Sequence, residues 1–298
     1  MQKLKIISLG LLCLISTVSL AQDTDAETGT VIQNLTPSKL IAKGQYDLKW
    51  FNNLYTQTES TFSEGREPRQ TFFTSTLEAY TGVSDHRRVN LGLILEFRSN
   101  VVAGRPALDV FQFDGERGTA RSGLTSIAPS IKFVPIANLS NFSIQSSVFI
   151  PLVDQETEDF TDFNPNGVFL DQDSFIVQNR FFYDYTFPAK KWQVFSELNT
   201  ELSLGDGEDS FANNSLRLTP GVFLSYFPSP KFTVLGLMQH SQLLDLGNNF
   251  SQDFTALGGG AKYQLSKALN VEVLYTNFVR GTDTGLGETF NIGLRAVF

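Results

Sequence analysis

The sequence FNIGLRAVF, at residues 290–298, decides the fold, because its side chains alternate between two chemical classes. One face is apolar and comprises Phe290, Ile292, Leu294, Ala296 and Phe298. The opposite face carries Asn291, Gly293, Arg295 and Val297. A period of two residues is typical of a β-strand that has an apolar environment on one side and a polar one on the other.

The same alternation recurs upstream, from about residue 45, and predicts about twelve strands, with ten or fourteen as alternatives. We expect them near 45–57, 70–82, 88–101, 124–137, 141–153, 173–187, 191–204, 214–228, 231–244, 252–265, 269–281 and 287–298. A tilted strand needs about 9–11 residues to cross a membrane, and most of these segments are longer. Pro220 interrupts the eighth segment, and a bulge near Pro220-Gly221 is expected there.

The connections between the predicted strands alternate in length. Tight turns follow the even-numbered strands, and longer segments follow the odd-numbered ones, at 58–69, 102–123, 154–172, 205–213, 245–251 and 282–286. Short turns at one end and long loops at the other are typical of a membrane barrel with its short turns in the periplasm. The sequence therefore predicts an all-β fold, a single antiparallel up-and-down transmembrane β-barrel over residues 45–298.

Alternation alone does not separate this barrel from a water-soluble sandwich, because both bury one face of every strand. Aromatic residues favour the barrel, since they collect where the short turns meet the strands. They are Tyr46, Phe133, Phe142, Phe187, Trp192, Tyr226, Phe227, Phe232, Tyr263 and Phe298. A ring of this kind is expected at a membrane interface.

Taken together, these features resemble Gram-negative outer-membrane β-barrels of the porin or transporter type. In that class the last strand ends in an aromatic residue and is read by the barrel-insertion machinery. The resemblance implies that Phe290, Ile292, Leu294 and Phe298 form an insertion signal, and that the insertion machinery and outer-membrane lipids are partners. More loosely, the chain resembles the meta-pathway phenol-degradation outer-membrane protein family.

The N-terminus has the pattern of a signal peptide over residues 1–21. Lys3 and Lys5 precede a short apolar run, and Ser19-Leu20-Ala21 is a small-x-small cleavage site, so we expect cleavage near Ala21. Leu12 stands before Cys13, which argues against a lipid anchor. Export then predicts the outer membrane of a Gram-negative bacterium, with residues 22–44 as a periplasmic N-terminal segment or a small plug.

Charge and cysteine content exclude several functions. Loss of Lys3 and Lys5 changes the net charge from −8 to −10, which disfavours a nucleic-acid partner because phosphate binding needs clustered basic residues. Cys13 is the only cysteine, so the mature chain has no thiol chemistry and no disulfide.

The polar faces of the predicted strands supply the candidate functional residues. Alternation assigns to the lumen Lys49, Glu78, Glu96, Arg98, Lys132, Arg180, Asp184, Glu197, Glu201, Arg217, Lys262, Glu272, Arg280 and Arg295. Charges of both signs along a lumen predict a passive channel or transporter for a small-molecule solute. The alternative is a structural or adhesive barrel with a side-chain-filled lumen, which acts through its acidic extracellular loops, because about twelve strands lie between filled and open barrels.

The acidic loop at 154–173 resembles the start of a calcium-binding loop. Asp162, Asn164, Asn166 and Asp173 have the spacing of oxygen ligands around that cation. Leu170 occupies a position that is usually polar, so a solvated acidic loop is the simpler interpretation, and no other cofactor is expected.

An enzyme is not predicted. The chain has two histidines, His86 and His240. His240 is followed by Ser241, and adjacent residues of a strand point to opposite faces, which prevents a catalytic dyad between them.

Overall fold

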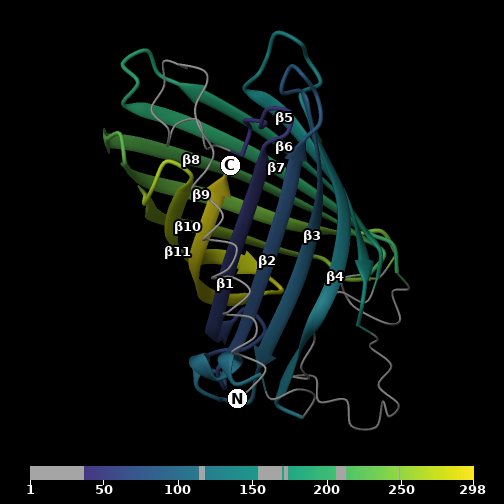
Figure 1. The fold of residues 1–298 in the computed structure, drawn as a ribbon. Coiled ribbons are helices and arrows are strands. Elements are labelled where there is room, and N and C mark those ends of the chain that lie inside the picture. Colours follow the sequence, from purple (N-terminus) through teal and green to yellow (C-terminus); the bar gives the residue numbers. More distant parts are fainter. Residues whose placement is uncertain (1–36, 114–117, 154–169, 171–173, 206–212, 248) are drawn as a thin grey trace.

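The computed structural model describes residues 37–113, 118–153, 170, 174–205, 213–247 and 249–298. Within these residues the chain forms a closed barrel of 12 antiparallel strands, in which sequence neighbours pair and β1 also pairs with β12 (Figure 1). The strands are β1 (Tyr46–Ser60), β2 (Gln70–Gly82), β3 (Val89–Val101), β4 (Ala120–Phe133), β5 (Phe142–Pro151), β6 (Ile176–Thr186), β7 (Trp192–Ser203), β8 (Ser215–Ser229), β9 (Phe232–Asp245), β10 (Gln252–Gln264), β11 (Leu269–Thr282) and β12 (Gly285–Val297). The predicted all-β up-and-down barrel is confirmed.

Helix makes a small contribution to the described part of the chain. A short 3-10 helix, η2 (Ala107–Phe111), lies in the connection between β3 and β4. No helix among the described residues has the length and apolar character needed to cross a membrane.

Most connections follow the predicted alternation in length, but the last one does not. β11 ends at Thr282 and β12 begins at Gly285, so Asp283 and Thr284 alone join them. Asp283 adopts a φ of 50°, a left-handed conformation that aspartate tolerates in tight turns. The longer segment expected at 282–286 is therefore wrong.

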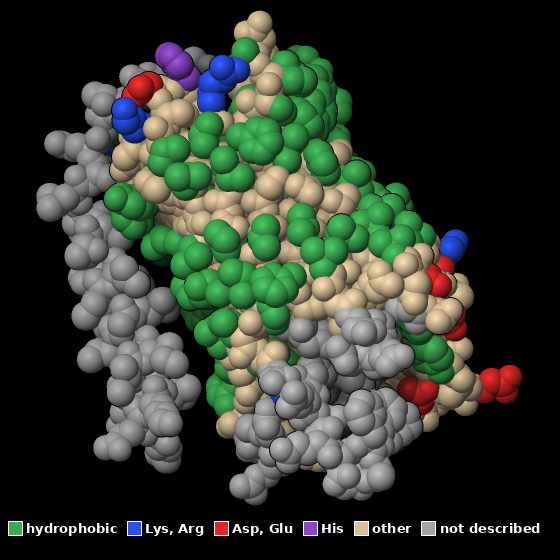
Figure 2. All heavy atoms as spheres, turned by 90° about the vertical axis from the view of Figure 1, so that its right-hand side faces the viewer, with side chains coloured by type: hydrophobic (Ala, Val, Ile, Leu, Met, Phe, Trp, Pro, Cys, Tyr) green, Lys and Arg blue, Asp and Glu red, His purple; other side chains and the backbone are tan. Residues whose placement is uncertain are grey.

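The outer wall of the barrel is apolar. Figure 2 shows hydrophobic side chains spread over the visible wall, with charged side chains and a histidine near its two ends. On β3, for example, Leu91 and Leu93 are exposed, whereas Asn90 and Ile94 on the other face are buried. In water such a wall would be a large apolar patch, so this distribution is that of a surface covered by lipid.

Aromatic residues near the short turns also lie on this wall. Tyr46, Phe187, Trp192, Phe232 and Tyr263 are exposed, and the Trp192 and Tyr226 rings contact each other with centroids 4.7 Å apart. Phe227 was placed in the same ring by sequence, but it is buried. Its neighbour Tyr226 takes the outer face, so Phe227 points into the barrel.

The barrel closes between its first and last strands. The Tyr46 N–H donates to the Phe298 carbonyl at 2.7 Å, and the Phe298 N–H donates to the Tyr46 carbonyl at 3.0 Å. The two rings are 5.9 Å apart. Further along β12, Phe290 and Ile292 are exposed on the outer wall. The alternation in FNIGLRAVF thus separates a lipid-facing side from a lumen-facing side.

Pro220 does not produce the expected bulge. In the β8–β9 pairing Leu218 faces Gln242 and Gly221 faces Gln239, which is one continuous register. Pro220 pairs with Leu198 of β7 but not with β9. Because proline lacks an N–H, the ladder is interrupted at Thr219 and Pro220 without a change of register, and this interruption is sufficient to accommodate the proline.

Candidate functional site in the barrel lumen

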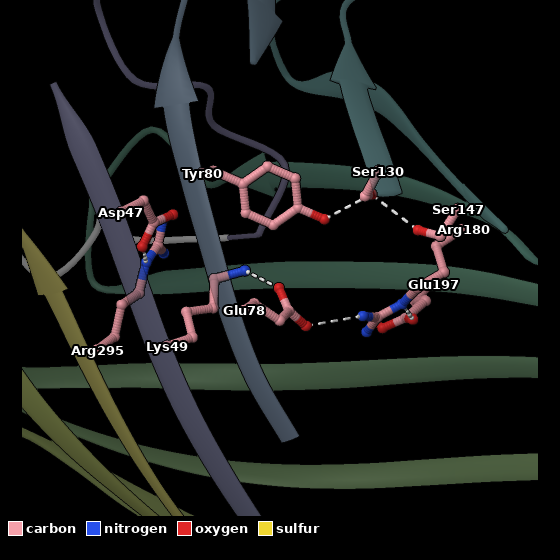
Figure 3. A network of polar contacts seen from close by, with 9 residues as sticks. All are labelled: Asp47, Lys49, Glu78, Tyr80, Ser130, Ser147, Arg180, Glu197 and Arg295. Atoms are coloured by element: carbon pink, nitrogen blue, oxygen red, sulfur yellow. Dashed lines mark hydrogen bonds and ion pairs between the residues drawn. The ribbon is translucent and has the colours of Figure 1, made fainter. Parts of the chain in front are cut away.

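A chain of charged side chains crosses the lumen. Lys49 of β1 contacts Glu78 of β2, with Nζ 3.1 Å from Oε2. Arg180 of β6 places Nη1 3.5 Å from Glu78 Oε1 and donates from Nε to Glu197 Oε1 of β7 at 2.7 Å. Three strands, β3, β4 and β5, separate β2 from β6 in the wall. The Glu78–Arg180 contact therefore crosses the interior of the barrel. We call Lys49, Glu78, Arg180 and Glu197 the ionic bridge (Figure 3).

The space between the ionic bridge and strands β3 to β5 is filled. Lys132 is 2% exposed, and its Nζ lies 4.9 Å from the centroid of the Tyr80 ring and 5.4 Å from that of Phe182. The two rings stabilise the buried ammonium through cation–π contacts. The Tyr80 hydroxyl is 2.8 Å from that of Ser130, which is 2.7 Å from the Ser147 hydroxyl (Figure 3). This side of the lumen is therefore packed with side chains.

Gly92 allows Tyr80 to reach across the barrel. The two residues are opposite each other in β3 and β2, and Ser130 is opposite Gly92 on the next strand, β4. A Cβ on Gly92 would lie 2.3 Å from Tyr80 Cδ1 and 2.7 Å from the Ala79 carbonyl oxygen. Any larger residue at position 92 must displace the ring or the backbone.

We expect Gly92→Ala to lower the free energy of unfolding by about 1–3 kcal/mol, the usual cost of overpacking a filled interior. Gly221→Ala is the matched control, because a Cβ at that lumen-facing glycine meets its nearest atom at 3.4 Å, an ordinary contact. Urea unfolding of the refolded barrel, followed by tryptophan fluorescence, measures both variants. Equal effects of the two substitutions would contradict the packing of Tyr80 on Gly92.

A second ion pair joins the strands that close the barrel. Arg295 of β12 donates from Nε to Asp47 Oδ1 at 2.8 Å and from Nη2 to Oδ2 at 2.7 Å. Both side chains are buried. A two-point contact between the planar guanidinium and the carboxylate fixes the geometry of both groups, so this pair fastens β1 to β12 from inside (Figure 3).

Charged side chains on the opposite wall are more accessible. Arg217 of β8 pairs with Glu201 of β7, both side chains being 26% exposed. Lys262 of β10 pairs with Glu272 of β11, at 29% and 20% exposure. The lumen is therefore less filled beside β7 to β11 than beside β3 to β5.

The remaining lumen candidates differ in their contacts and in their exposure. Glu96 accepts from Arg98 at 2.8 Å within β3. Asp184 is buried and accepts hydrogen bonds from Ser38 and Gln193. Arg280 is the exception to the predicted faces. A bulge between Thr255 and Ala256 in the β10–β11 register moves Arg280 opposite Thr255, and its side chain is 70% exposed beside Asp253.

Residues 37–44 meet the barrel at its short-turn end. Ser38, Leu40 and Ile41 are buried, and the Gly44 N–H donates to the Gly82 carbonyl at 3.0 Å. Lys43 donates to Asp85 in the β2–β3 turn, and this bond and the lysine charge lower the pKa of the Asp85 carboxyl. Since Asp184 faces the lumen and accepts from Ser38, part of this segment lies across the barrel end.

An aromatic cluster inside the long-loop end was missed by sequence reasoning. The Tyr55 ring is 6.1 Å from that of Phe72 and 4.9 Å from that of Phe278, which stacks on Phe254 at 4.1 Å. Tyr55 reaches β11 over Gly287 of β12, where a Cβ would lie 2.9 Å from its ring. The available signal was that Tyr55 shares the face of Lys49 in a strand of period two.

Metal and catalytic candidates gain no support from the described residues. The calcium candidates Asp162, Asn164, Asn166 and Asp173 lie outside the described part. Elsewhere, the described residues hold no group of three or more histidine, cysteine, aspartate or glutamate side chains suited to a metal ion.

The predicted separation of His240 and Ser241 agrees with their contacts. His240 Nδ1 lies 3.0 Å from Thr255 Oγ1, whereas buried Ser241 contacts Thr219 on the opposite face of the sheet. The two side chains therefore form no dyad.

Comparisons with known proteins identify the fold but not a family. No protein-family model matches the chain, and no curated protein matches it in sequence. An outer-membrane channel from Pseudomonas putida F1 superposes with a TM-score of 0.65 at 11% sequence identity, covering 93% of this chain and 100% of that one. The β-domain of the Bordetella autotransporter BrkA gives 0.54 at 11% identity, covering 85% and 99%. The chain thus has the fold of outer-membrane β-barrels.

Proposed function

We propose that this chain is a passive channel for small solutes in the outer membrane of a Gram-negative bacterium. The observation that carries the proposal is the set of lumen charges beside β7 to β11, which are paired but still 20–29% exposed. Charged groups inside a barrel need water or a partner, because their desolvation is costly. A hydrated, charged lumen with a lipid-facing outer wall is the arrangement that conducts solutes.

The path runs between the ionic bridge and strands β8 to β11. The filled side, with Lys132 and Tyr80, leaves no room for a solute. Lumen charges of both signs occur close together as Glu201–Arg217 and Lys262–Glu272, so strong discrimination by charge is not expected. The aromatic cluster around Tyr55 and Phe278 offers flat apolar surfaces near the entrance.

The test is planar-bilayer recording of the refolded mature chain, together with swelling of liposomes in small sugars and amino acids. We expect small conductance steps and uptake that falls steeply with solute size, because the ionic bridge divides the lumen. Heat-dependent migration in detergent gels serves as the control for folding. A folded barrel that passes neither ions nor any small solute would contradict the proposal.

A second function is favoured by one observation. Lys132 and Gln145 are buried in the lumen, and Ser38, Leu40 and Ile41 are buried at the barrel end. This burial is expected of a structural or adhesive barrel with a filled lumen. Such a protein would act through its acidic loops. Deleting residues 154–172 should then abolish partner binding, whereas in a channel the same deletion leaves permeability intact or increases it.

We also propose that the exposed face of β12 is the signal read by the barrel-insertion machinery. Phe290 and Ile292 are exposed on the outer wall, and Phe298 packs on Tyr46 where the barrel closes. A chain without Phe298 should therefore accumulate less assembled barrel in outer-membrane fractions than the full chain does. Calcium binding by the loop at 154–173 remains a sequence-based expectation.

A further inference from the structure

The connection between β3 and β4 folds outward, onto the outer wall of the barrel. Val110 of η2 is completely buried and packs with Phe73, Val101 and Ala120. On β3, Val101 shares the face of Leu91, which is exposed on the lipid-facing wall. The outer face of β3 is therefore exposed at Leu91 but covered by η2 at Val101, at the long-loop end of the strand.

Several contacts hold this connection on the wall. Ser99 donates from its hydroxyl to the Val110 carbonyl at 2.6 Å. The Phe111 ring lies 5.0 Å from that of Phe73, and the Phe113 ring lies 5.4 Å from that of Phe97. Phe97 is four residues before the end of β3, which corresponds to about 13 Å along a strand. The connection therefore turns back down the wall and does not rise into solvent.

One side of η2 packs on the barrel wall, and another side points away from the wall. In a 3-10 helix residues three apart point the same way, so Leu108 and Phe111 share one side and Ala107 and Val110 share another. Leu108 is 70% exposed, and Phe111 and Phe113 are 46% and 38% exposed. Leu108 therefore projects away from the wall, whereas Phe111 and Phe113 each contact a ring of the wall and leave the rest of their surface exposed. The wall below them carries the hydrophobic side chains that Figure 2 shows over the barrel.

We infer that residues 106–113, here termed the outer-wall segment, insert into the membrane leaflet at the long-loop end, with Leu108, Phe111 and Phe113 among the acyl chains. Continuity with the lipid-facing wall supports lipid as the occupant. Within the described residues 105–113 the charged side chains are Arg105 and Asp109, which form an ion pair at 3.0 Å. Insertion therefore does not bring an unpaired charge of that pair into the apolar layer.

A second copy of the chain is the less suitable occupant. A stable protein interface buries roughly 800 Å² on each partner, and three side chains on and beside a helix of five residues offer only part of such a surface. The inference is independent of the proposed transport, because the contacts described above for the outer-wall segment are with the outer face of the wall. It also assigns this connection to the membrane and not to a constriction of the pore.

Leu108→Cys in the mature chain tests the inference, since the only natural cysteine is Cys13. Glu64→Cys is the water-exposed control, at a charged and exposed position of the neighbouring β1–β2 connection, and Leu91→Cys is the lipid-facing control on β3. Each refolded variant, in phosphatidylcholine vesicles, is treated with a charged maleimide. We expect the thiol at position 108 to react as slowly as that at position 91 and far more slowly than that at position 64, because a thiol in hydrocarbon does not ionise readily.

A second measurement separates lipid from protein as the covering material. A bimane group is attached to each introduced thiol before refolding, and fluorescence is compared in vesicles with and without brominated acyl chains. Quenching at positions 108 and 91, but not at 64, supports the inference. Rapid maleimide reaction at position 108 overturns it, and slow reaction without quenching also overturns it, because a second copy would then cover the segment. Conductance is not measured, so failure here leaves the transport proposal standing.

Discussion

Replacing Arg295 with methionine is expected to lower the free energy of unfolding of the barrel by about 3–5 kcal/mol, because it leaves the Asp47 carboxylate buried without its cation. The pair is bidentate, with distances of 2.8 and 2.7 Å, and it joins β1 to β12. Its loss therefore weakens the contact on which closure of the barrel depends. Chemical unfolding of the refolded protein in vesicles, followed by tryptophan fluorescence, measures the change.

Two further variants serve as controls for the effect of Arg295→Met on the free energy of unfolding. Lys43→Met breaks the exposed pair with Asp85, and we expect no measurable loss of stability, since exposed ion pairs contribute little. The double variant Asp47→Leu with Arg295→Met removes both charges and should recover most of the loss. If Arg295→Met lowered the free energy of unfolding no more than Lys43→Met does, the contact between β1 and β12 would be held by backbone pairing alone.

Replacing Arg180 with glutamine is expected to raise the single-channel conductance and to shift ion selectivity towards cations. Arg180 contacts both Glu78 and Glu197 across the lumen, so its removal opens the ionic bridge and leaves one more uncompensated negative charge beside the path. A ring or cluster of carboxylates favours cations in a pore. The reversal potential in a salt gradient measures selectivity, and step size measures conductance.

Matched variants separate the two effects. Arg66→Gln makes the same change of charge at an exposed position in the β1–β2 loop and should alter neither quantity appreciably. Arg180→Lys keeps the charge but cannot reproduce the forked contact with two carboxylates, so we expect higher conductance with little change in selectivity. An unchanged reversal potential in Arg180→Gln would show that ions do not pass beside the bridge.

Local periodicity was sufficient to predict the strands and most of their faces. The alternation in FNIGLRAVF and in the other strands placed Glu78, Arg180 and Arg295 on one side of the sheet, and the structure has them there. Arg280 shows the limit of this reasoning. One extra residue in β11 opposite Thr255 and Ala256 reverses every assignment beyond it, and no residue type marks that bulge in the sequence.

Contacts across the lumen were not predictable from periodicity. Glu78 and Arg180 are far apart in sequence, and they meet because the strand number, tilt and stagger of a closed barrel bring their strands to opposite sides of a narrow interior. The same holds for Tyr80 and Tyr55, which extend over Gly92 and Gly287. A glycine in a strand indicates that something packs closely there, but it does not say which ring.

Hydrogen bonding between Tyr46 and Phe298 also has a consequence for biosynthesis. β1 can acquire its second neighbour only after β12, the strand that follows all the others, has left the ribosome. Until then a growing chain exposes two unpaired sheet edges, which are the surfaces most prone to aggregation. The order of strands therefore means that the barrel closes only after β12 has been synthesised, and a chain interrupted before β12 would keep the free edge of β1.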